Sequence, residues 1–291
     1  MHKNNQNNQS ELKKEPFFPL YSSRCESYDL GRHIRKAKKK THNTGLWYEK
    51  FCDQWTFEHD GKIVTEVTLG NKKSKWIETV TRHEIGYATE IKRANYRLQH
   101  LVKEKGGQLI RMKTISRFIP GMGRPHPVDN GINWHPTLGV PYLQGSSVKG
   151  AVRAWAESYD ENKNQSDIQR IFGSDRKDPT QNDEDHSVGS IIFFDAIPAG
   201  PVRLVADVMT PHFSNYYKDP KNNSPSEREN PIPIPFLAVE ENQPFLFAIA
   251  PRRREYSEDM KKVIQWLKKA MFWTGAGAKT AVGYGRFEET Q

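Results

Sequence analysis

The sequence contains little cysteine and no long apolar run. Its 291 residues include two cysteines, Cys25 and Cys52, and neither has the spacing of a metal ligand. This scarcity excludes a disulfide framework or a zinc ribbon and predicts a cytoplasmic protein. No stretch approaches the ~20 apolar residues of a membrane span, and residues 1–15 have no apolar core of a secretory signal. We therefore expect no membrane association.

The positive charge is concentrated in the first third of the chain. The formal net charge is +9, and residues 1–105 contain 21 Lys and Arg against 13 Asp and Glu, whereas residues 106–291 contain 23 against 22. Six of the nine residues from Arg32 to Lys40 are basic, which is typical of a solvated arm and also suits phosphate contact. Lys and Arg nearly balance Asp and Glu in residues 106–291. If this part of the chain binds an anion, its cations must therefore be gathered at one place on the surface.

The spacing of apolar residues predicts an α+β protein. Helical periodicity extends over residues 72–105, with a break near Gly86. Alternation over residues 108–119 predicts a strand with one basic face. Further helices are expected at 146–159, 168–172 and 257–274, and further strands at 62–69, 189–197, 202–209, 236–239, 244–250 and 282–287. The turn between 189–197 and 202–209 predicts that these two strands form a hairpin.

From residue 108 onward the expected order is β-α-β-β-α-β, which is the ferredoxin-like arrangement also found in RRM domains. We therefore divide the chain into a basic, partly disordered N-terminal extension with a long helix (1–105) and a ferredoxin-like domain with insertions (106–291). The aromatic signature of RRM sheets is absent. Phosphate contact at the loops beside the helices is therefore expected, rather than stacking of bases on the sheet.

The stretch from Gly275 to Phe287 is rich in glycine and alanine. Only Lys279, Thr280, Tyr284 and Arg286 project far from it, and a loop of bare amides with two cations and one ring suits a polyanion. It is not a nucleotide loop. The Walker pattern would need glycine where Trp273 and Ala278 stand, and the dinucleotide pattern fails because Thr280 replaces its last glycine.

A second informative stretch runs from Pro141 to Trp155. Ser146 or Ser147 is expected to cap a helix here, and the residues at helical spacing that should form its buried stripe are Val148, Ala151, Val152, Trp155 and Tyr159. Lys149 and Arg153 are four residues apart and share an exposed face. A cation in the first turn opposes the helix dipole, so this is either a mildly frustrated surface helix or the place where an anion binds. We favour the anion.

Other polar residues have structural interpretations. His126 and His135 are expected to make hydrogen bonds within the loop 120–141 rather than to act in catalysis. Asp195 and Asp207 are expected to make edge or loop contacts, since no cluster of metal-ligating residues accompanies them. Neither a metal site nor a cofactor is predicted. Ser257 is expected to cap the last helix and Gly275 to end it.

The two informative stretches resemble motifs of a known superfamily. Pro141–Arg153 is similar to the segment P-Y-I-P-G-S-S-L-K-G-x-x-R of RAMP proteins, with Gln144 where the family often has proline. Gly275–Phe287 is similar to their glycine-rich loop, G-x-G-A-K-T-x-x-G-Y-G-R-F. Together with Asp207–His212 and the adjacent tyrosines at 216 and 217, they most resemble the sixth-subunit family of type III-B CRISPR (Cmr) effector complexes. The resemblance covers residues 108–291.

This resemblance implies a non-catalytic RNA-binding subunit that contacts the guide RNA (crRNA) backbone toward its 3′ end and helps hold the guide–target duplex in antiviral defence. The implied partners are guide RNA, target RNA and other Cmr subunits: the backbone RAMP subunit, the small helical subunit and the RAMP subunit that caps the 3′ end. A protrusion after His212 would be a thumb-like insertion. The predicted RNA-binding residues are Arg124, Ser146, Ser147, Lys149, Arg153, His212, Gly275, Gly277, Lys279, Thr280, Tyr284 and Arg286.

Two alternatives remain open at this point. The chain could be a metal-independent endoribonuclease that processes guide RNA, with His126, His212, Lys279 and Tyr284 as the groups available for general acid, general base and charge stabilisation. It could instead be a scaffold subunit that binds only protein, through a basic surface that contacts acidic neighbours.

Overall fold

The computed structural model describes residues 43–52, 56–60, 63–124, 126, 128, 130–174, 187–210, 213, 216–217, 219–225 and 233–290. The basic run 32–40, the predicted disorder near the N-terminus and His212 lie outside the described residues. None of the helices in the described ranges has the length and apolarity needed to cross a membrane. In the same ranges, no three His, Cys, Asp or Glu side chains gather as metal ligands would.

The main sheet is antiparallel, with the strand order β4-β8-β3-β9. Its strands are β3 (Gln108–Thr114), β4 (Ile191–Phe193), β8 (Pro244–Pro251) and β9 (Phe287–Glu289), and the short β5 (Ile197–Pro198) also pairs with β8. In β3, Ile110 and Met112 are buried whereas Arg111 is exposed, as the alternation predicts. Ile110 pairs with Phe247 in the centre of the sheet.

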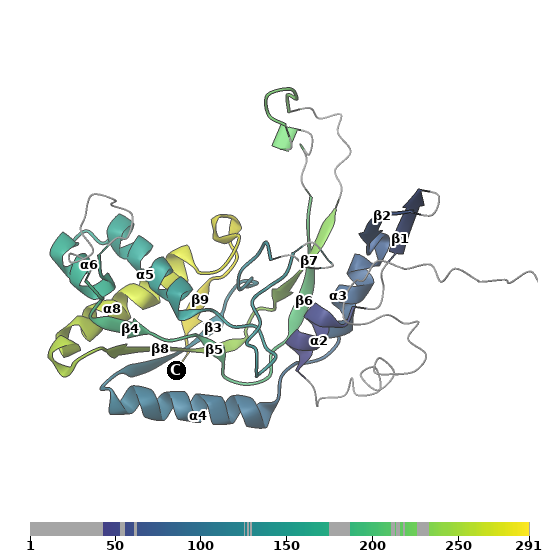
Figure 1. Cartoon of the computed structure of the whole chain (residues 1–291). Helices are drawn as coiled ribbons and strands as arrows, with labels where there is room; N and C mark the ends of the chain where they lie inside the picture. The colour runs from purple at the N-terminus through teal and green to yellow at the C-terminus, as the bar shows by residue number, and fades with distance from the viewer. Residues whose placement is uncertain are drawn as a thin grey trace, which may run out of the picture.

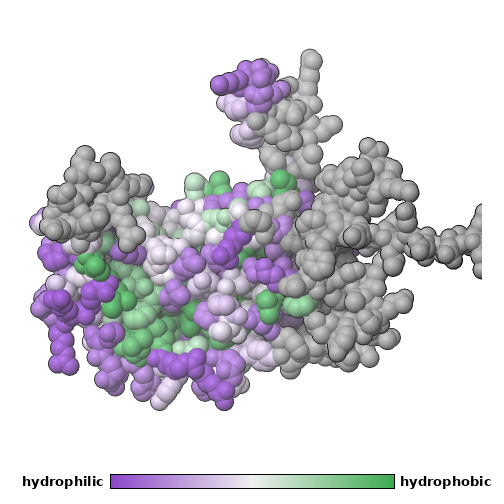
Figure 2. Space-filling model, viewed as in Figure 1, coloured by the Kyte–Doolittle hydropathy of each residue, from purple (hydrophilic) through white to green (hydrophobic). Residues whose placement is uncertain are grey.

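Helices cover both faces of this sheet (Figure 1). On one face α5 (Gly145–Tyr159) packs against α8 (Ser257–Lys269), and α6 (Gln165–Phe172) packs against α5. On the other face α4 (Ala88–Glu104) runs along β3 and β8. Figure 2 shows hydrophobic residues gathered over the region of β4 and β8, with hydrophilic residues around them.

The long helix expected over residues 72–105 is two helices, as the predicted break near Gly86 indicates. α3 (Lys73–Thr81) and α4 are separated at Gly86, whose φ is +94°. Residues on both sides of position 105 share one hydrophobic cluster, in which Trp76 and Ile91 are buried together with Phe245 and Phe287.

A second sheet pairs β6 (Leu204–Met209) with β7 (Ile234–Val239), and α3 packs against both strands. The predicted hairpin of 189–197 with 202–209 is therefore wrong, because β4 and β5 pair with β8 while β6 pairs with β7. Val202 bridges Ile85 by two backbone hydrogen bonds, and this contact directs the chain out of the first sheet. Residues 220–225, between β6 and β7, are exposed and lie far beyond both strands (Figure 1).

The remaining elements are short. They are α2 (Thr44–Lys50), the hairpin β1 (Thr56–Asp60) with β2 (Ile63–Thr68), the 3₁₀ turns η1 (Gly70–Lys72), η3 (Arg254–Tyr256) and η5 (Thr280–Val282), and the π-helical turn η4 (Ala270–Thr274). The strand predicted at 62–69 is confirmed by β2. The strand predicted at 282–287 is wrong, because η5 and two glycines with positive φ precede β9.

The prediction that Ser257 caps the last helix is also wrong. The N-cap of α8 is Tyr256, with no side-chain cap, because the preceding turn η3 brings Ser257 inside the first helical turn. Asp259, in that turn, is buried and accepts hydrogen bonds from Arg170 (2.7 Å) and Ser190 (2.6 Å). Gly275 ends the helix as predicted, after the π-helical turn.

Candidate nucleic-acid interface

The helix α5 begins at Gly145, two residues earlier than a cap by Ser146 would allow. Its N-cap is Gln144, which makes no side-chain cap hydrogen bond, so the predicted cap by Ser146 or Ser147 is wrong. Asp195, from the segment after β4, supplies the missing acceptor: its Oδ1 lies 2.7 Å from the amide of Gly145. A carboxylate at this end also compensates the helix dipole. The loop contact expected of Asp195 is confirmed.

The two cations of α5 lie close to other protein charges. Burial lowers the pKa of Lys149, and the neighbouring charges of Arg153 and Arg252 lower it further. Arg153 donates to Glu157 one turn later, with 2.6 Å between Nε and Oε1. Lys149 is therefore near a third cation that the sequence pattern did not indicate, Arg252 at the end of β8.

The glycine-rich loop uses most of its amides to hold its own shape. Ala276 donates to the carbonyl of Gly285 (2.9 Å), and Gly285 donates to Arg117 (2.8 Å). The two arms of the loop thus cross closely: a Cβ at Gly275 would stand 2.7 Å from the carbonyl oxygen of Gly285, and one at Gly285 would overlap the carbonyl oxygen of Ala276. The expectation of a loop of bare amides is corrected, because these amides already have partners.

The long side chains of the loop also contact protein groups. Tyr284 donates to Asp207 Oδ2 (2.6 Å), and Arg117 bonds the same oxygen (2.6 Å). Burial raises the pKa of Tyr284 to about 12, and its hydrogen bond to Asp207 adds to this. Burial would raise the pKa of Asp207, but the hydrogen bonds from Tyr284 and Arg117 outweigh it and lower that pKa. The contact role expected of Asp207 is confirmed.

Lys279 and Arg286, the two cations of the loop, also contact protein groups. Lys279 has a φ of +59°, and its Nζ lies 5.8 Å from the ring centroid of Phe236. Arg286 donates to the carbonyl of Phe272 over 3.2 Å. These contacts hold Lys279 against β7 and Arg286 against the π-helical turn η4.

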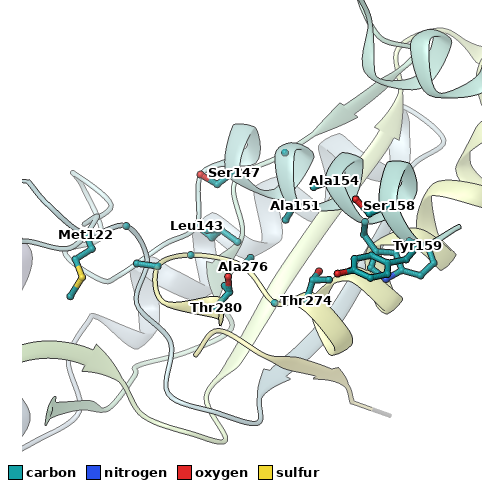
Figure 3. Close-up of a pocket in the computed structure, with 16 residues that line it drawn as sticks. Met122, Leu143, Ser147, Ala151, Ala154, Ser158, Tyr159, Thr274, Ala276 and Thr280 are labelled. Atoms are coloured by element: carbon teal, nitrogen blue, oxygen red, sulfur yellow. The ribbon is translucent and has the colours of Figure 1, made fainter. Parts of the chain in front are cut away.

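A groove of about 630 Å³ separates α5 from the glycine-rich loop (Figure 3). Among the described residues that line it, none is charged. They are Gly121, Met122, Leu143, Ser147, Gly150, Ala151, Ala154, Trp155, Ser158, Tyr159, Thr274, Gly275, Ala276, Gly277, Ala278 and Thr280.

The structure brings four of the predicted RNA-binding residues together on this groove: Ser147 on α5, and Gly275, Gly277 and Thr280 on the loop. The others that it describes are not among the lining residues. They are Arg124, Ser146, Lys149, Arg153, Lys279, Tyr284 and Arg286. Arg124 is exposed in the loop before α5 and bridges Gly131.

Sequence reasoning missed one face of α5. Ser147, Gly150, Ala151, Ala154 and Ser158 follow helical spacing and are small, and all of them line the groove. This stripe could have been found by looking for small residues as well as apolar ones. Tyr159, expected on the buried stripe, has an exposed fraction of 63% and also lines the groove.

The two loop histidines make the local hydrogen bonds that were expected. His126 Nδ1 accepts from the amide of Val128, and His135 Nδ1 accepts from the amide of Leu138, each over 3.3 Å. The ring of His126 stacks on Tyr48 with 4.6 Å between centroids, and burial lowers the pKa of His126 to about 4.

The RAMP superfamily profile matches residues 111–288, which include both motif stretches. The chain belongs to the RAMP superfamily. Its likeness is to Cmr6 proteins in particular. It is 32% identical over 231 residues to the CRISPR system Cmr subunit Cmr6 of Pyrococcus furiosus, covering 62% of this chain and 67% of the relative. It is 31% identical over 162 residues to that of Saccharolobus solfataricus, covering 55% of this chain and 49% of the relative.

The fold agrees with this assignment. A chain in the cryo-EM structure of the Type III-B Cmr-beta bound to cognate target RNA superposes with a TM-score of 0.59. The two chains are 22% identical, and the superposition covers 77% of this chain and 72% of that one. The chain is thus a Cmr6-like RAMP protein that spans about half the length of the Saccharolobus relative.

Proposed function

We propose that this protein is a non-catalytic subunit of a type III-B CRISPR RNA-guided effector complex. In this proposal it binds the guide RNA backbone toward its 3′ end and helps hold the guide–target duplex in antiviral defence. Its relatives are named as Cmr subunits, and a chain of similar fold comes from a Cmr complex bound to target RNA. Its partners would be both RNAs, the backbone RAMP subunit, the small helical subunit and the subunit that caps the 3′ end, in the cytoplasm.

One observation carries the proposal. The two stretches that resemble RAMP motifs are far apart in the sequence, yet Ser147 from the first and Thr280 from the second line the same groove (Figure 3). Tertiary packing has thus placed both motifs around one surface feature. Residues that converge on a concave site are the default candidates for ligand contact.

The sheet supports a ferredoxin-like domain over residues 106–291. Starting from the edge strand β9, the strand order of the main sheet is β9-β3-β8-β4. The helices α5 and α8 pack together on one face of it. This is the order expected for β-α-β-β-α-β with the β6–β7 hairpin inserted. Residues 1–105 would then be an extension whose α4 packs on the other face of the sheet.

Phosphate contacts are proposed at two pairs of cations. The first is Lys149 and Arg153 on α5, near Arg252. The second is Lys279 and Arg286, both on the glycine-rich loop. Each pair should be changed to alanine in the full chain, and the complex should be purified from cells that express its other subunits and a guide. Neutralising a phosphate releases counterions, so each pair variant should weaken guide binding uniformly across sequences. The slope of log K against the logarithm of the salt concentration (the salt slope) should fall in magnitude by about 2.

The matched control changes Lys92 and Lys103, exposed on α4 against the other face of the sheet. It should leave guide content and salt slope unchanged. If both pair variants co-purify as much guide RNA as the wild type, the proposed contacts are wrong. If the wild-type complex contains no guide RNA, the proposed function itself fails.

The ribonuclease alternative has its own test. Its candidate groups differ in environment, since the ring of His126 stacks on Tyr48 whereas Tyr284 is bonded to Asp207. Purified protein should be incubated with repeat RNA in EDTA, and we expect no specific cleavage. Cleavage that disappears in His212→Ala would establish an enzyme and overturn the non-catalytic proposal.

A further inference from the structure

The groove between α5 and the glycine-rich loop has a chemistry that does not suit phosphate. No charged side chain is among its described lining residues. Its walls consist mainly of small residues and of hydroxyl groups, the latter from Ser147, Ser158, Thr274 and Thr280. A phosphate placed there would lose water without meeting a cation, which is unfavourable. The ligand part that fits such a groove is uncharged and able to form hydrogen bonds.

One end of the groove is aromatic. Tyr159 lines it with an exposed fraction of 63%, next to the buried Trp155, and the two rings stack with centroids 6.4 Å apart. Figure 3 shows Tyr159 at the end of the groove near Thr274. Lys269 Nζ lies 5.5 Å from the ring centroid of Trp155, so a cation stands beside this aromatic end. Among the described residues, the ring of Trp155 is the one that stacks on Tyr159. The exposed Tyr159 ring therefore offers a flat apolar face to a ligand.

We propose that this groove takes a nucleobase and its ribose from single-stranded RNA, with the base stacked on Tyr159 and the ribose hydroxyl bonded by the groove's side chains. The inference rests on the proposed RNA-binding function and deepens it by assigning different parts of the nucleotide to different surfaces. The phosphates stay outside, near cations such as Lys269. Bases stack on aromatic side chains without regard to sequence.

The dimensions and the lining favour a nucleotide over a peptide segment. A groove of about 630 Å³ is within the range of small-ligand sites. Gly150, Ala151 and Ala154 let a flat ring approach the backbone of α5, whereas an apolar peptide anchor would need deep apolar pockets. Ser147 and Thr280 lie on the two walls of the groove, one on α5 and one on the loop, and their hydroxyl groups suit the 2′-hydroxyl of ribose (Figure 3).

The test uses the purified full chain and a fluorescein-labelled 12-nucleotide oligouridine, measured by fluorescence anisotropy at several salt concentrations. Tyr159→Ala should weaken binding roughly 5- to 150-fold, the range for loss of one base–aromatic stack. The salt slope should not change, because no phosphate contact is removed. Tyr159→Phe should retain binding. Ala154→Phe, which fills the groove from an exposed helix position, should weaken binding to a similar degree.

The matched control is Tyr96→Ala on α4, whose ring is 61% exposed and which should bind as the wild type does. If the wild type binds and both Tyr159→Ala and Ala154→Phe bind equally well, the inference is overturned while the proposed function stands. If both variants keep oligouridine binding and the complex purified from cells with either variant lacks a partner subunit, the groove is a protein interface and the inference is again overturned. Absence of any salt-sensitive binding by the wild type overturns the proposed function as well.

A second arm tests the ribose. Oligodeoxyuridine of the same length should bind more weakly than the RNA, by roughly 2- to 10-fold, the value of one net hydrogen bond. Combining Ser147→Ala with Thr280→Ala should remove this difference. A preference for RNA that survives the double substitution would contradict the assignment of the 2′-hydroxyl to these two side chains.

Discussion

The two walls of the groove are built by different means. One wall is the regular helix α5, whose small residues recur at helical spacing and whose first amide is capped by Asp195. The other is an irregular loop that keeps its shape through crossing backbone hydrogen bonds and the bond between Tyr284 and Asp207. The helix wall depends on local periodicity, whereas the loop wall depends on contacts with distant parts of the chain. The loop wall should therefore be the more sensitive to single substitutions.

The largest effect is expected from Gly285→Ala. Its φ is +73°, and a Cβ there would overlap the carbonyl oxygen of Ala276, so the backbone must move. We expect a loss on the order of 3 kcal/mol in the free energy of unfolding, measured by urea denaturation.

Gly283→Ala is the control for this substitution. Its φ is +97°, but nothing would lie within 4 Å of a Cβ at this position, so only the conformational cost of about 1 kcal/mol applies. Equal losses for the two variants would show that the crossing of the two arms does not determine the stability of the loop wall.

A smaller loss is expected from Asp207→Asn, which weakens the bonds from Tyr284 and Arg117. Hydrogen bonds to a charged group contribute roughly 1.5–3 kcal/mol, so we expect a loss of about 2 kcal/mol at neutral pH. Tyr284→Phe should lose part of this amount and keep the packing of the ring on the loop.

The bonds of Asp207 with Tyr284 and Arg117 predict that the free energy of unfolding depends on pH. The folded state lowers the pKa of Asp207. The contribution of Asp207 to the free energy of unfolding is therefore present above the ordinary carboxyl pKa of about 4 and is lost as the pH falls below it. Because the folded state raises the pKa of Tyr284 to about 12, that contribution is present below pH of about 10 and is lost as the pH rises toward 12. Urea denaturation of the wild type and Asp207→Asn from pH 2.5 upward should converge at acid pH. Curves that stay parallel would contradict this account.

The smallest effects are expected on the helix wall. Asp195→Ala removes the acceptor at the start of α5 and should reduce the free energy of unfolding by about 1 kcal/mol, as for loss of an N-cap. Ser146→Ala should change it by less than about 0.5 kcal/mol, since Ser146 is exposed and does not cap. The opposite ranking in thermal or urea denaturation would restore the serine cap that the sequence suggested.

Much of this fold could be predicted because its signals are local. The stripe of Val148, Val152 and Trp155 predicts α5, and the alternation in β3 predicts which side chains are buried. Both RAMP motifs are contiguous in sequence, so the superfamily could be identified from the sequence alone. The pairing of β6 with β7 could not be read in this way, because Val202 leaves the first sheet through a contact with Ile85, far earlier in the chain.

The sequence by itself determined the α+β class, the helix α5 with its stripe of apolar residues, and the two motifs that identify the superfamily. These follow from residue spacing along short segments. Only the tertiary structure decided that Asp195 caps α5, that Tyr284 is bonded to Asp207, and that the groove is lined by hydroxyl groups rather than by Lys149 and Arg153. The physical reason is that each of these depends on which distant segments pack together, and residue spacing does not encode the position of a partner across the sheet.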